Sequence, residues 1–151
     1  MHSGLLPDAS LGDMLIGNVG GCLGEVSALM LIVGGIYLVV RRVINPIIPL
    51  SFIGTVFALT AVAGANPLQQ ILSGGVMLGA IFMATDYTTT PITLRGQMIF
   101  AVGCGLLTSL IRTWGGYPEG VSYSILIMNL TVPLIDRVTK PRIFGEVKKH
   151  G

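Results

Sequence analysis

Apolar residues dominate the chain and are interrupted at only a few short polar points. A transmembrane helix needs about 20 mostly apolar residues. The run from Val43 to Thr85 holds 43 residues without a charge, which is too long for one crossing, and Gly64–Pro67 (GANP) is a turn signal that divides it. The pattern therefore predicts five membrane spans, at about residues 22–40, 46–63, 68–85, 96–112 and 120–136.

Composition supports an all-α integral membrane fold. The sequence is 52% hydrophobic and only 11% charged, with a mean hydropathy of +0.79, whereas soluble domains carry about 25% charged residues. The 21 glycines, among them the closely spaced Gly75 and Gly79, favour tight helix packing in lipid. The fourth and fifth predicted spans are short, so we expect them to be tilted or partly re-entrant.

The basic residues predict the orientation of these spans. If the C-terminus is cytoplasmic, eight of the nine lysines and arginines at or between the spans and in the tail fall inside, and only Arg112 falls outside. This predicts an external N-terminal segment at 1–21, a five-helix membrane domain at 22–136 and a basic cytoplasmic tail at 137–151.

The loop after the third predicted span holds the first charge that follows the long uncharged run. Asp86 is followed by Thr88 and two further threonines, then by Pro91 and Arg95. One interpretation is that Asp86 caps a threonine-rich turn and pairs with Arg95 at the interface. The other is that its carboxylate and the hydroxyls form the entrance of an ion path, because Na⁺ prefers oxygen ligands and ionisable groups at membrane depth are functional by default.

Three further polar residues are candidates for such a path. Asp136 ends the fifth predicted span on the same side as that loop, and either pairs with Arg137 or adds a second negative charge to the entrance. Glu25 lies in the first turn of the first span, where the helix dipole favours a carboxylate, or else near an ion exit. Asn129, just before Pro133, either bonds to a neighbouring helix or belongs to a broken helix that lines a path.

Four motifs, in order along the chain, resemble one membrane-protein family. They are GNVGGCLGEVSALMLIVGGIYLVVRR, GGVMLGAIFMATDYTTTP, IRTWGGYPEGVSYSILIMNLTVPLID and TKPRIFGE. Together they resemble the D subunit of the Rnf ion-translocating oxidoreductase and, more distantly, the B subunit of the sodium-translocating NADH:quinone oxidoreductase. The resemblance covers nearly the whole chain but only the C-terminal half of the family's usual length. It implies one of two inverted five-helix repeats, and it leads us to expect a fragment, a split half or a truncated gene product.

The resemblance also implies a function, cofactors and partners. Such a subunit belongs to a bacterial inner-membrane complex that passes electrons through flavins and iron–sulfur centres and couples their flow to movement of Na⁺ or H⁺. Its partners would be the other subunits and membrane lipid. The family carries FMN covalently on a threonine of a Ser-x-Ala-Thr-like motif, which this sequence lacks, since Thr85 follows Ala84 only superficially and at the cytoplasmic side. We expect no covalent flavin in this chain, and contact with a non-covalent riboflavin stays open.

Two other functions remain compatible with the sequence. One is a passive channel or small-solute transporter built from five-helix units, and the other is an inactive fragment. The ordered motifs favour the redox-driven ion pump over a channel. The sequence contains no nucleophile–base pair, phosphate-binding loop or zinc motif, and its short basic tail is not the footprint of a nucleic-acid binder.

Overall fold

The computed structural model describes residues 27–72, 75–115 and 120–140, and all the regular structure in these ranges is helical. Apolar runs broken by turn residues fold here as helices of very different length. In chain order they are α2 (Ala28–Val40), α3 (Ile47–Val62), α4 (Pro67–Leu72), α5 (Val76–Leu78), the π-helical turn η1 (Gly79–Met83), α6 (Leu94–Gly115) and α7 (Gly120–Thr139). Glu25 and the segments 1–21 and 141–151 lie outside the described residues.

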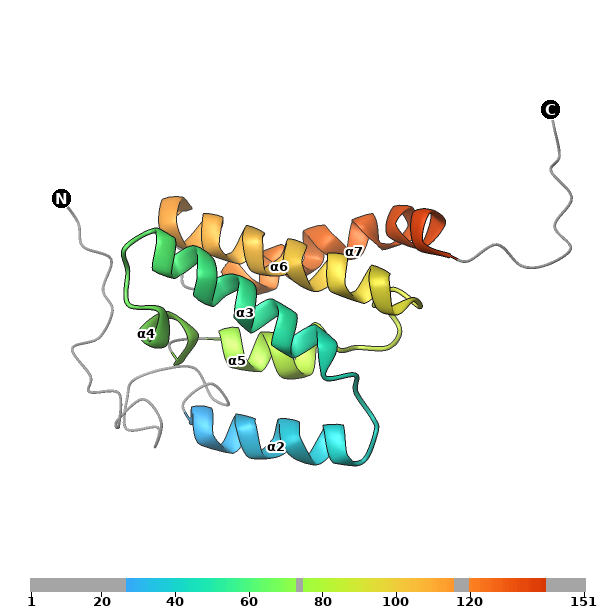
Figure 1. Ribbon diagram of the computed structural model, residues 1–151, viewed down its shortest axis with the longest axis horizontal. Helices are drawn as coiled ribbons and strands as arrows, with labels where there is room; N and C mark the ends of the chain where they lie inside the picture. The colour runs from blue at the N-terminus through green and yellow to red at the C-terminus, as the bar shows by residue number, and fades with distance from the viewer. Residues whose placement is uncertain (1–26, 73–74, 116–119, 141–151) are drawn as a thin grey trace, which may run out of the picture.

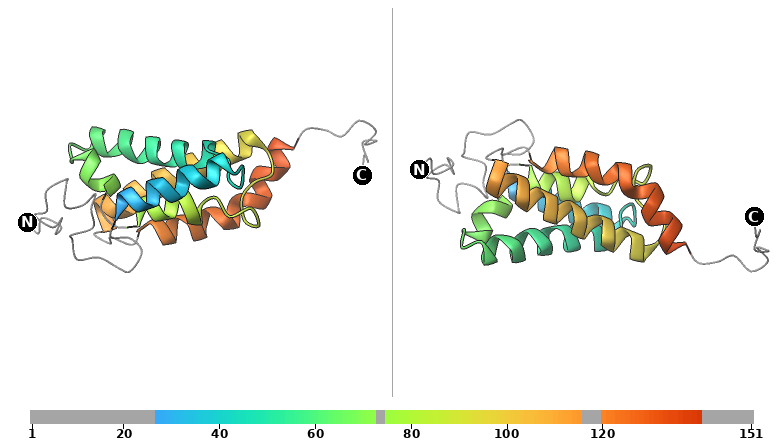
Figure 2. Two further views of the ribbon diagram at one scale, coloured as in Figure 1. Left: turned by 90° about the horizontal axis from the view of Figure 1, so that it is seen from below. Right: turned by 90° about the horizontal axis from the view of Figure 1, so that it is seen from above.

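The helices pack in layers around α6 (Figure 1). α3 and α7 lie against α6, and the short α5–η1 segment packs on α3 and α7. α2 lies on the outer side of α5 and η1 and crosses the face of the bundle (Figure 2). This arrangement places the turn between α2 and α3, the loop after η1 and the end of α7 at the same end of the molecule.

The third predicted span is wrong as a continuous helix. Residues 67–83 instead hold the six residues of α4, the three of α5 and the five of η1. The sequence Ser-Gly-Gly at 73–75 gives a physical reason, because each glycine in a helix interior costs about 1 kcal/mol relative to alanine. In η1 the Ala84 amide bonds to the carbonyl of Gly79, five residues earlier, at 2.7 Å. The prediction of five continuous helices is therefore not confirmed.

The last two helices are longer than the sequence pattern predicts. α6 has 22 residues and α7 has 20, and both are long and apolar enough to cross a membrane, whereas α2 and α3 are apolar but shorter. At 1.5 Å per residue α6 is about 33 Å long. α7 stays helical through Pro133 and changes direction in its second half (Figure 2). The expected short or re-entrant fourth and fifth spans are thus wrong in length.

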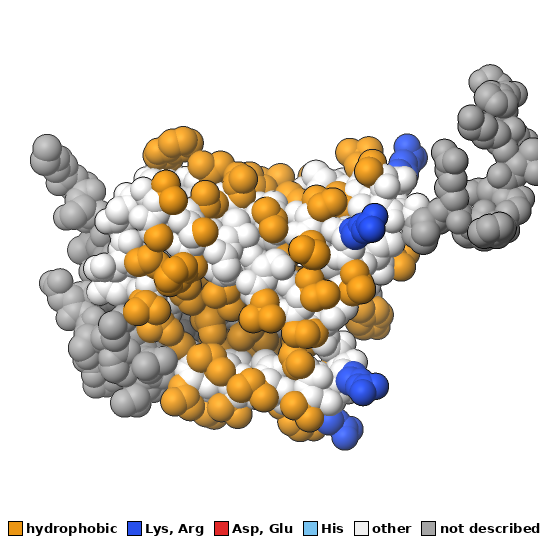
Figure 3. All heavy atoms as spheres, in the orientation of Figure 1, with side chains coloured by type: hydrophobic (Ala, Val, Ile, Leu, Met, Phe, Trp, Pro, Cys, Tyr) orange, Lys and Arg blue, Asp and Glu red, His pale blue; other side chains and the backbone are white. Residues whose placement is uncertain are grey.

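Apolar side chains face outward as well as inward. The buried core includes Phe52, Val56 and Phe100, none more than 1% exposed. Many other large apolar side chains lie on the outside of the bundle (Figure 3), such as Leu130 of α7 at 81% exposed. Water would disfavour such a surface, since exposed apolar patches of this extent mark interaction or membrane surfaces. The all-helical architecture is consistent with a membrane protein.

Small residues and one buried hydroxyl pair hold α6 against its neighbours. A Cβ on Gly105 would lie 2.7 Å from the Cβ of Thr55 and 3.0 Å from the carbonyl oxygen of Phe52, so α3 and α6 approach closely there. The hydroxyls of Thr108 on α6 and Ser124 on α7 lie 2.7 Å apart in the core. Hydrogen bonds of this kind between membrane helices contribute about 0.6 kcal/mol on average.

We expect Gly105→Ala to destabilise the fold by roughly 1–3 kcal/mol, because the added methyl group meets the backbone of α3 and overpacks the contact. Gly54→Ala is the matched control, since a Cβ at Gly54 meets nothing within 4 Å. Thermal unfolding of the purified protein in detergent measures both. Equal unfolding temperatures for the two variants would contradict the close α3–α6 contact.

Candidate binding site at the basic end of the helix bundle

Most of the described charges gather at one end of the bundle. Blue lysine and arginine side chains gather at this end in Figure 3. We name this region the basic end. By their places in the helices and loops, its basic residues are Arg41, Arg42, Arg95, Arg137 and Lys140, and its acidic residues are Asp86 and Asp136. Arg112 lies near the other end of α6, where its guanidinium donates to the carbonyl oxygen of Gln70 at 2.8 Å. The described charges are thus divided between the two ends as the positive-inside pattern requires.

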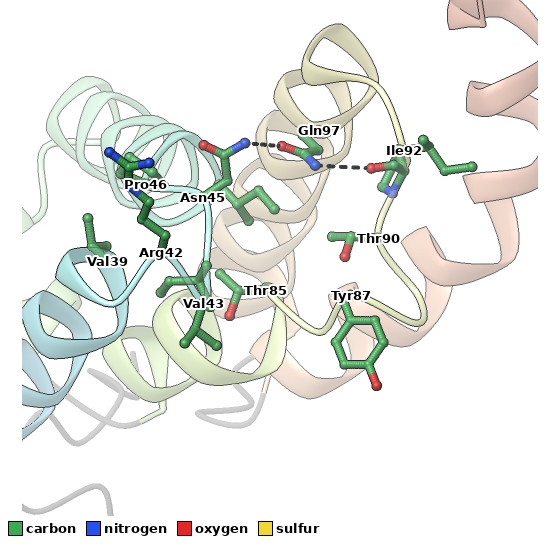
Figure 4. Close-up of a pocket in the computed structure, with 13 residues that line it drawn as sticks. Val39, Arg42, Val43, Asn45, Pro46, Thr85, Tyr87, Thr90, Ile92 and Gln97 are labelled. Carbon is green, nitrogen blue, oxygen red and sulfur yellow. Dashed lines mark hydrogen bonds between the residues drawn. The ribbon is translucent and has the colours of Figure 1, made fainter.

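A cavity of about 600 Å³ opens at the basic end, between the α2–α3 turn and the loop that follows η1. We call it the end pocket. Its polar lining residues are Arg42, Asn45, Thr85, Tyr87, Thr90 and Gln97, and its apolar lining includes Val39, Ile44 and Pro46. Figure 4 shows Asn45 and Gln97 along one side of the pocket, with Thr85, Thr90 and Tyr87 on the side formed by the loop.

Two side-chain amides fix one wall of the end pocket. The Nδ2 of Asn45 donates to the Oε1 of Gln97 at 3.1 Å. The Nε2 of Gln97 in turn donates to the carbonyl oxygen of Pro91 at 3.2 Å. The α2–α3 turn, helix α6 and the loop after η1 are therefore joined by one hydrogen-bonded chain (Figure 4).

Arg42 occupies a backbone position that usually belongs to glycine. The Arg42 amide bonds to the carbonyl of Val39 and the Val43 amide to that of Leu38, both at 2.9 Å. This pair of bonds is the Schellman ending, whose residue after the cap takes a left-handed conformation, and Arg42 has φ 55°. For a residue with a Cβ this conformation costs roughly 1–2 kcal/mol.

The end of α3 provides an internal comparison for this turn. There the Gly64 amide bonds to Ala61 and the Ala65 amide to Thr60, in the same pattern at 3.2 Å. Gly64 has φ 77° and carries no side chain that would be strained. The same turn thus ends two helices of this chain, and only at the end pocket does it carry an arginine.

The predicted turn at Asp86 is present in the loop after η1. The Asp86 carboxylate accepts the Thr88 amide at 3.3 Å and the Thr88 hydroxyl at 2.8 Å, and its backbone oxygen accepts the Thr90 amide and hydroxyl. Both Asp86 and Thr88 are exposed, and the carboxylate does not pair with Arg95. Neither residue is among those that line the end pocket, so their role in an ion path stays a prediction.

Asp136 holds the far end of the same loop. Its Oδ1 accepts the backbone amide of Ile92 at 3.2 Å, and this bond takes the place of the suggested pair with Arg137. One residue later, the Thr93 hydroxyl accepts the Gly96 amide at 3.1 Å and caps α6. The two acidic residues at this end therefore both bind the loop, one from within it and one from α7.

The other sequence candidates lie away from the end pocket or lack the expected partner. The side-chain Oδ1 of Asn129 is buried in α7 without a hydrogen-bond partner, so the expected bond from this atom to a neighbouring helix is not seen. Thr85 lines the end pocket, yet its hydroxyl donates to the carbonyl of Ile81 at 2.6 Å and it is only 9% exposed. In the described ranges no three His, Cys, Asp or Glu residues are grouped to hold a metal.

Sequence reasoning missed the residues that give the end pocket its chemistry. In the sequence pattern Arg42 bears only on the orientation of the spans, and Asn45 and Gln97 carry no signal of a site. The available signal was the string RRVINP at 41–46, in which a basic residue and an amide follow a long apolar helix directly before a proline. Gln97, 52 positions after Asn45, carries no local signal, because only the fold brings it beside the turn.

Comparisons with known proteins agree on one family. The sequence profile of the NQR2, RnfD, RnfE family matches residues 2–145. The D subunit of the Na⁺-translocating ferredoxin:NAD⁺ oxidoreductase complex of Acetobacterium woodii is 52% identical over 133 residues, which cover 88% of this chain and 42% of the relative. The D subunit of the proton-translocating ferredoxin:NAD⁺ oxidoreductase complex of Clostridium ljungdahlii is 50% identical over 87% of this chain and 42% of the relative.

A third relative extends the match almost to the full chain. The D subunit of the ion-translocating oxidoreductase complex of Stutzerimonas stutzeri is 45% identical over 95% of this chain and 41% of the relative. The chain thus spans about two fifths of the length of the curated relatives it matches.

We expect Asp136→Ala to loosen the loop before α6, because the Ile92 amide loses its acceptor at a cost of roughly 1–2 kcal/mol. Hydrogen–deuterium exchange in peptides covering residues 86–97 should become about tenfold faster, since tenfold corresponds to 1.4 kcal/mol. Asp136→Asn keeps an acceptor oxygen and should exchange nearly as the unchanged protein does. Unchanged exchange in the alanine variant would show that Asp136 does not anchor the loop.

Proposed function

This chain belongs to the NQR2, RnfD, RnfE family, and we propose that it forms part of a membrane subunit that helps couple electron transfer to translocation of Na⁺ or H⁺. The observation that carries the proposal is identity of 45–52% to the D subunits of three ion-translocating oxidoreductase complexes, over 87–95% of this chain. The predicted resemblance is thereby confirmed at the level of the family. Activity, electron carriers, transported ion and partner subunits of this protein belong to the proposal.

The shape and charge of the described residues support a place in the membrane. α6 and α7 are long and apolar enough to cross it, and apolar side chains cover the outside of the bundle. We assign the basic end to the cytoplasmic side by the positive-inside rule. The other subunits of the complex are the proposed partners, and the exposed apolar faces of α2 and α7 are surfaces on which they or lipid would pack.

The test is ion-coupled turnover in membranes of the source organism. A strain without the gene for this chain should lose Na⁺- or H⁺-dependent electron transfer between ferredoxin and NAD⁺, and a plasmid copy should restore it. Reporters fused after Arg42 and after Gly64 should read inside and outside. Unchanged ion-coupled activity in the deletion strain would refute the proposed function.

We further propose that Asp86, Thr88 and Asp136 supply oxygens at a cytoplasmic ion entrance, and we expect Asp86→Asn to test this. Asparagine keeps an acceptor for the Thr88 amide, and the Thr88 hydroxyl is able to accept from its amide group. The substitution therefore removes the charge with little change to the turn. If the charge admits Na⁺, half-maximal turnover needs more Na⁺, with tenfold for each 1.4 kcal/mol of lost affinity.

The control for the charge change is Arg41→Gln, at an exposed position of the same end. A matching Na⁺ curve for Asp86→Asn and the unchanged protein, in a complex that requires Na⁺, would leave Asp86 as a residue that caps the turn.

A further inference from the structure

A second cavity continues the end pocket toward the middle of the bundle. This side groove has a volume of about 290 Å³ and lies between α2, α3 and the α5–η1 segment. Its lining consists of aliphatic side chains, prolines, a methionine and Gly35. Val39, Ile44 and Pro46 line both cavities, so the polar end pocket and the apolar side groove are adjacent compartments with a shared wall.

We propose that these two compartments bind one anionic phospholipid, with its phosphate at Arg42 in the end pocket and an acyl chain in the side groove. The order of the compartments matches such a ligand. The polar part lies at the end of the bundle, where charges gather, and the apolar part runs along helices whose outer faces are apolar. Basic pockets between transmembrane helices on the cytoplasmic side are known to recognise anionic headgroups.

The charge in the end pocket selects an anion. Arg42 is the one charged residue among those that line it, and within the described part of the chain its guanidinium makes no hydrogen bond or ion pair. Asp86 and Asp136 bind the loop instead of facing Arg42. A phosphate would therefore find an arginine whose fork of donors is free to bind two of its oxygens.

The backbone of Arg42 is a second, independent observation that points to a ligand for its side chain. It stands in the left-handed position of a Schellman turn at φ 55°, where α3 uses Gly64. A strained residue at a pocket is reason to infer function when the strain itself is observed. The strain also makes Arg42→Gly an informative variant. Glycine should relieve the backbone strain and so stabilise the fold, while the loss of the guanidinium removes the proposed contact with the phosphate.

The remaining polar groups fit a headgroup at the interface. Asn45 and Gln97 are held by their mutual hydrogen bond, so the pocket wall is formed before a ligand arrives. Thr90 and Tyr87 also line the pocket, and Tyr87 is 89% exposed. The side groove favours a phospholipid over a free phosphate as the ligand. Its wall is wholly apolar, so it can pack against an acyl chain but has no hydrogen-bond donor for an inorganic anion.

The experiment measures lipid binding to the full-length protein in the assembly with which it purifies. The delipidated sample is titrated with phosphatidylglycerol, or with phosphatidylcholine of the same acyl chains, and bound lipid is counted by native mass spectrometry. We expect Arg42→Gln to weaken phosphatidylglycerol binding about tenfold and phosphatidylcholine binding little. Arg41→Gln is the matched control, since Arg41 is exposed like Arg42 but lies outside the pocket lining.

A second variant, Arg42→Gly, separates loss of lipid binding from loss of folding. Without lipid this variant should unfold at the same temperature as the unchanged protein or higher, and it should lose the stabilisation that phosphatidylglycerol gives.

Equal weakening of phosphatidylglycerol binding by Arg41→Gln and Arg42→Gln would overturn the proposal in favour of general surface charge. Glycerol 3-phosphate competing as well as the lipid would replace it with a free-anion site, and a flavin recovered at one per pocket would replace it with a flavin site. Because binding is measured directly, the result does not depend on ion-coupled activity.

Discussion

Backbone amides and carbonyls that a helix end leaves unpaired find no partner in lipid, and in the described part of the chain several of them bond to the chain's own atoms. Unpaired backbone groups in the hydrocarbon region cost several kcal/mol each. α2 and α3 end in Schellman turns that reuse their last carbonyls. The loop before α6 takes its partners from Asp86, Asp136 and Thr93. Both acidic side chains at the basic end are therefore committed to the backbone of that end.

A polar side chain that bonds to the backbone of its own turn needs no further role to explain its position, whereas a side chain without such a bond does. Asp86 attracts attention in the sequence as an isolated carboxylate, yet its four hydrogen bonds with Thr88 and Thr90 account for its position within the turn. Arg42 attracts less attention, because a basic residue at a helix end is ordinary in a membrane protein. In the structure Arg42 is the more informative of the two, since among the residues described its side chain bonds to no backbone group and its backbone conformation is unfavourable.

Sequence patterns predict the long helices and the distribution of charge, but they do not predict contacts between residues that lie far apart in the chain. The apolar runs locate α3, α6 and α7, and the distribution of arginines separates the two ends of the bundle. The break between α4 and α5 is not predicted, because hydropathy over 68–85 is high whether the segment is one helix or several pieces. The hydrogen bond between Asn45 and Gln97 is beyond sequence reasoning as well, since neither residue signals its partner.

A pair of glycines in α2 sets how closely this helix approaches η1 beside the end pocket. A Cβ on Gly35 would lie 2.8 Å from Cγ2 of Ile81, and one on Gly34 would lie 3.1 Å from the ring of Phe82. α2 therefore rests directly on η1, whose π-helical turn adds a residue to the helix at that contact, as such turns often do at functional sites. Because α2 is held this close, its last turn meets the loop that leaves η1. The end pocket, with Arg42 in its lining, lies between the α2–α3 turn and that loop.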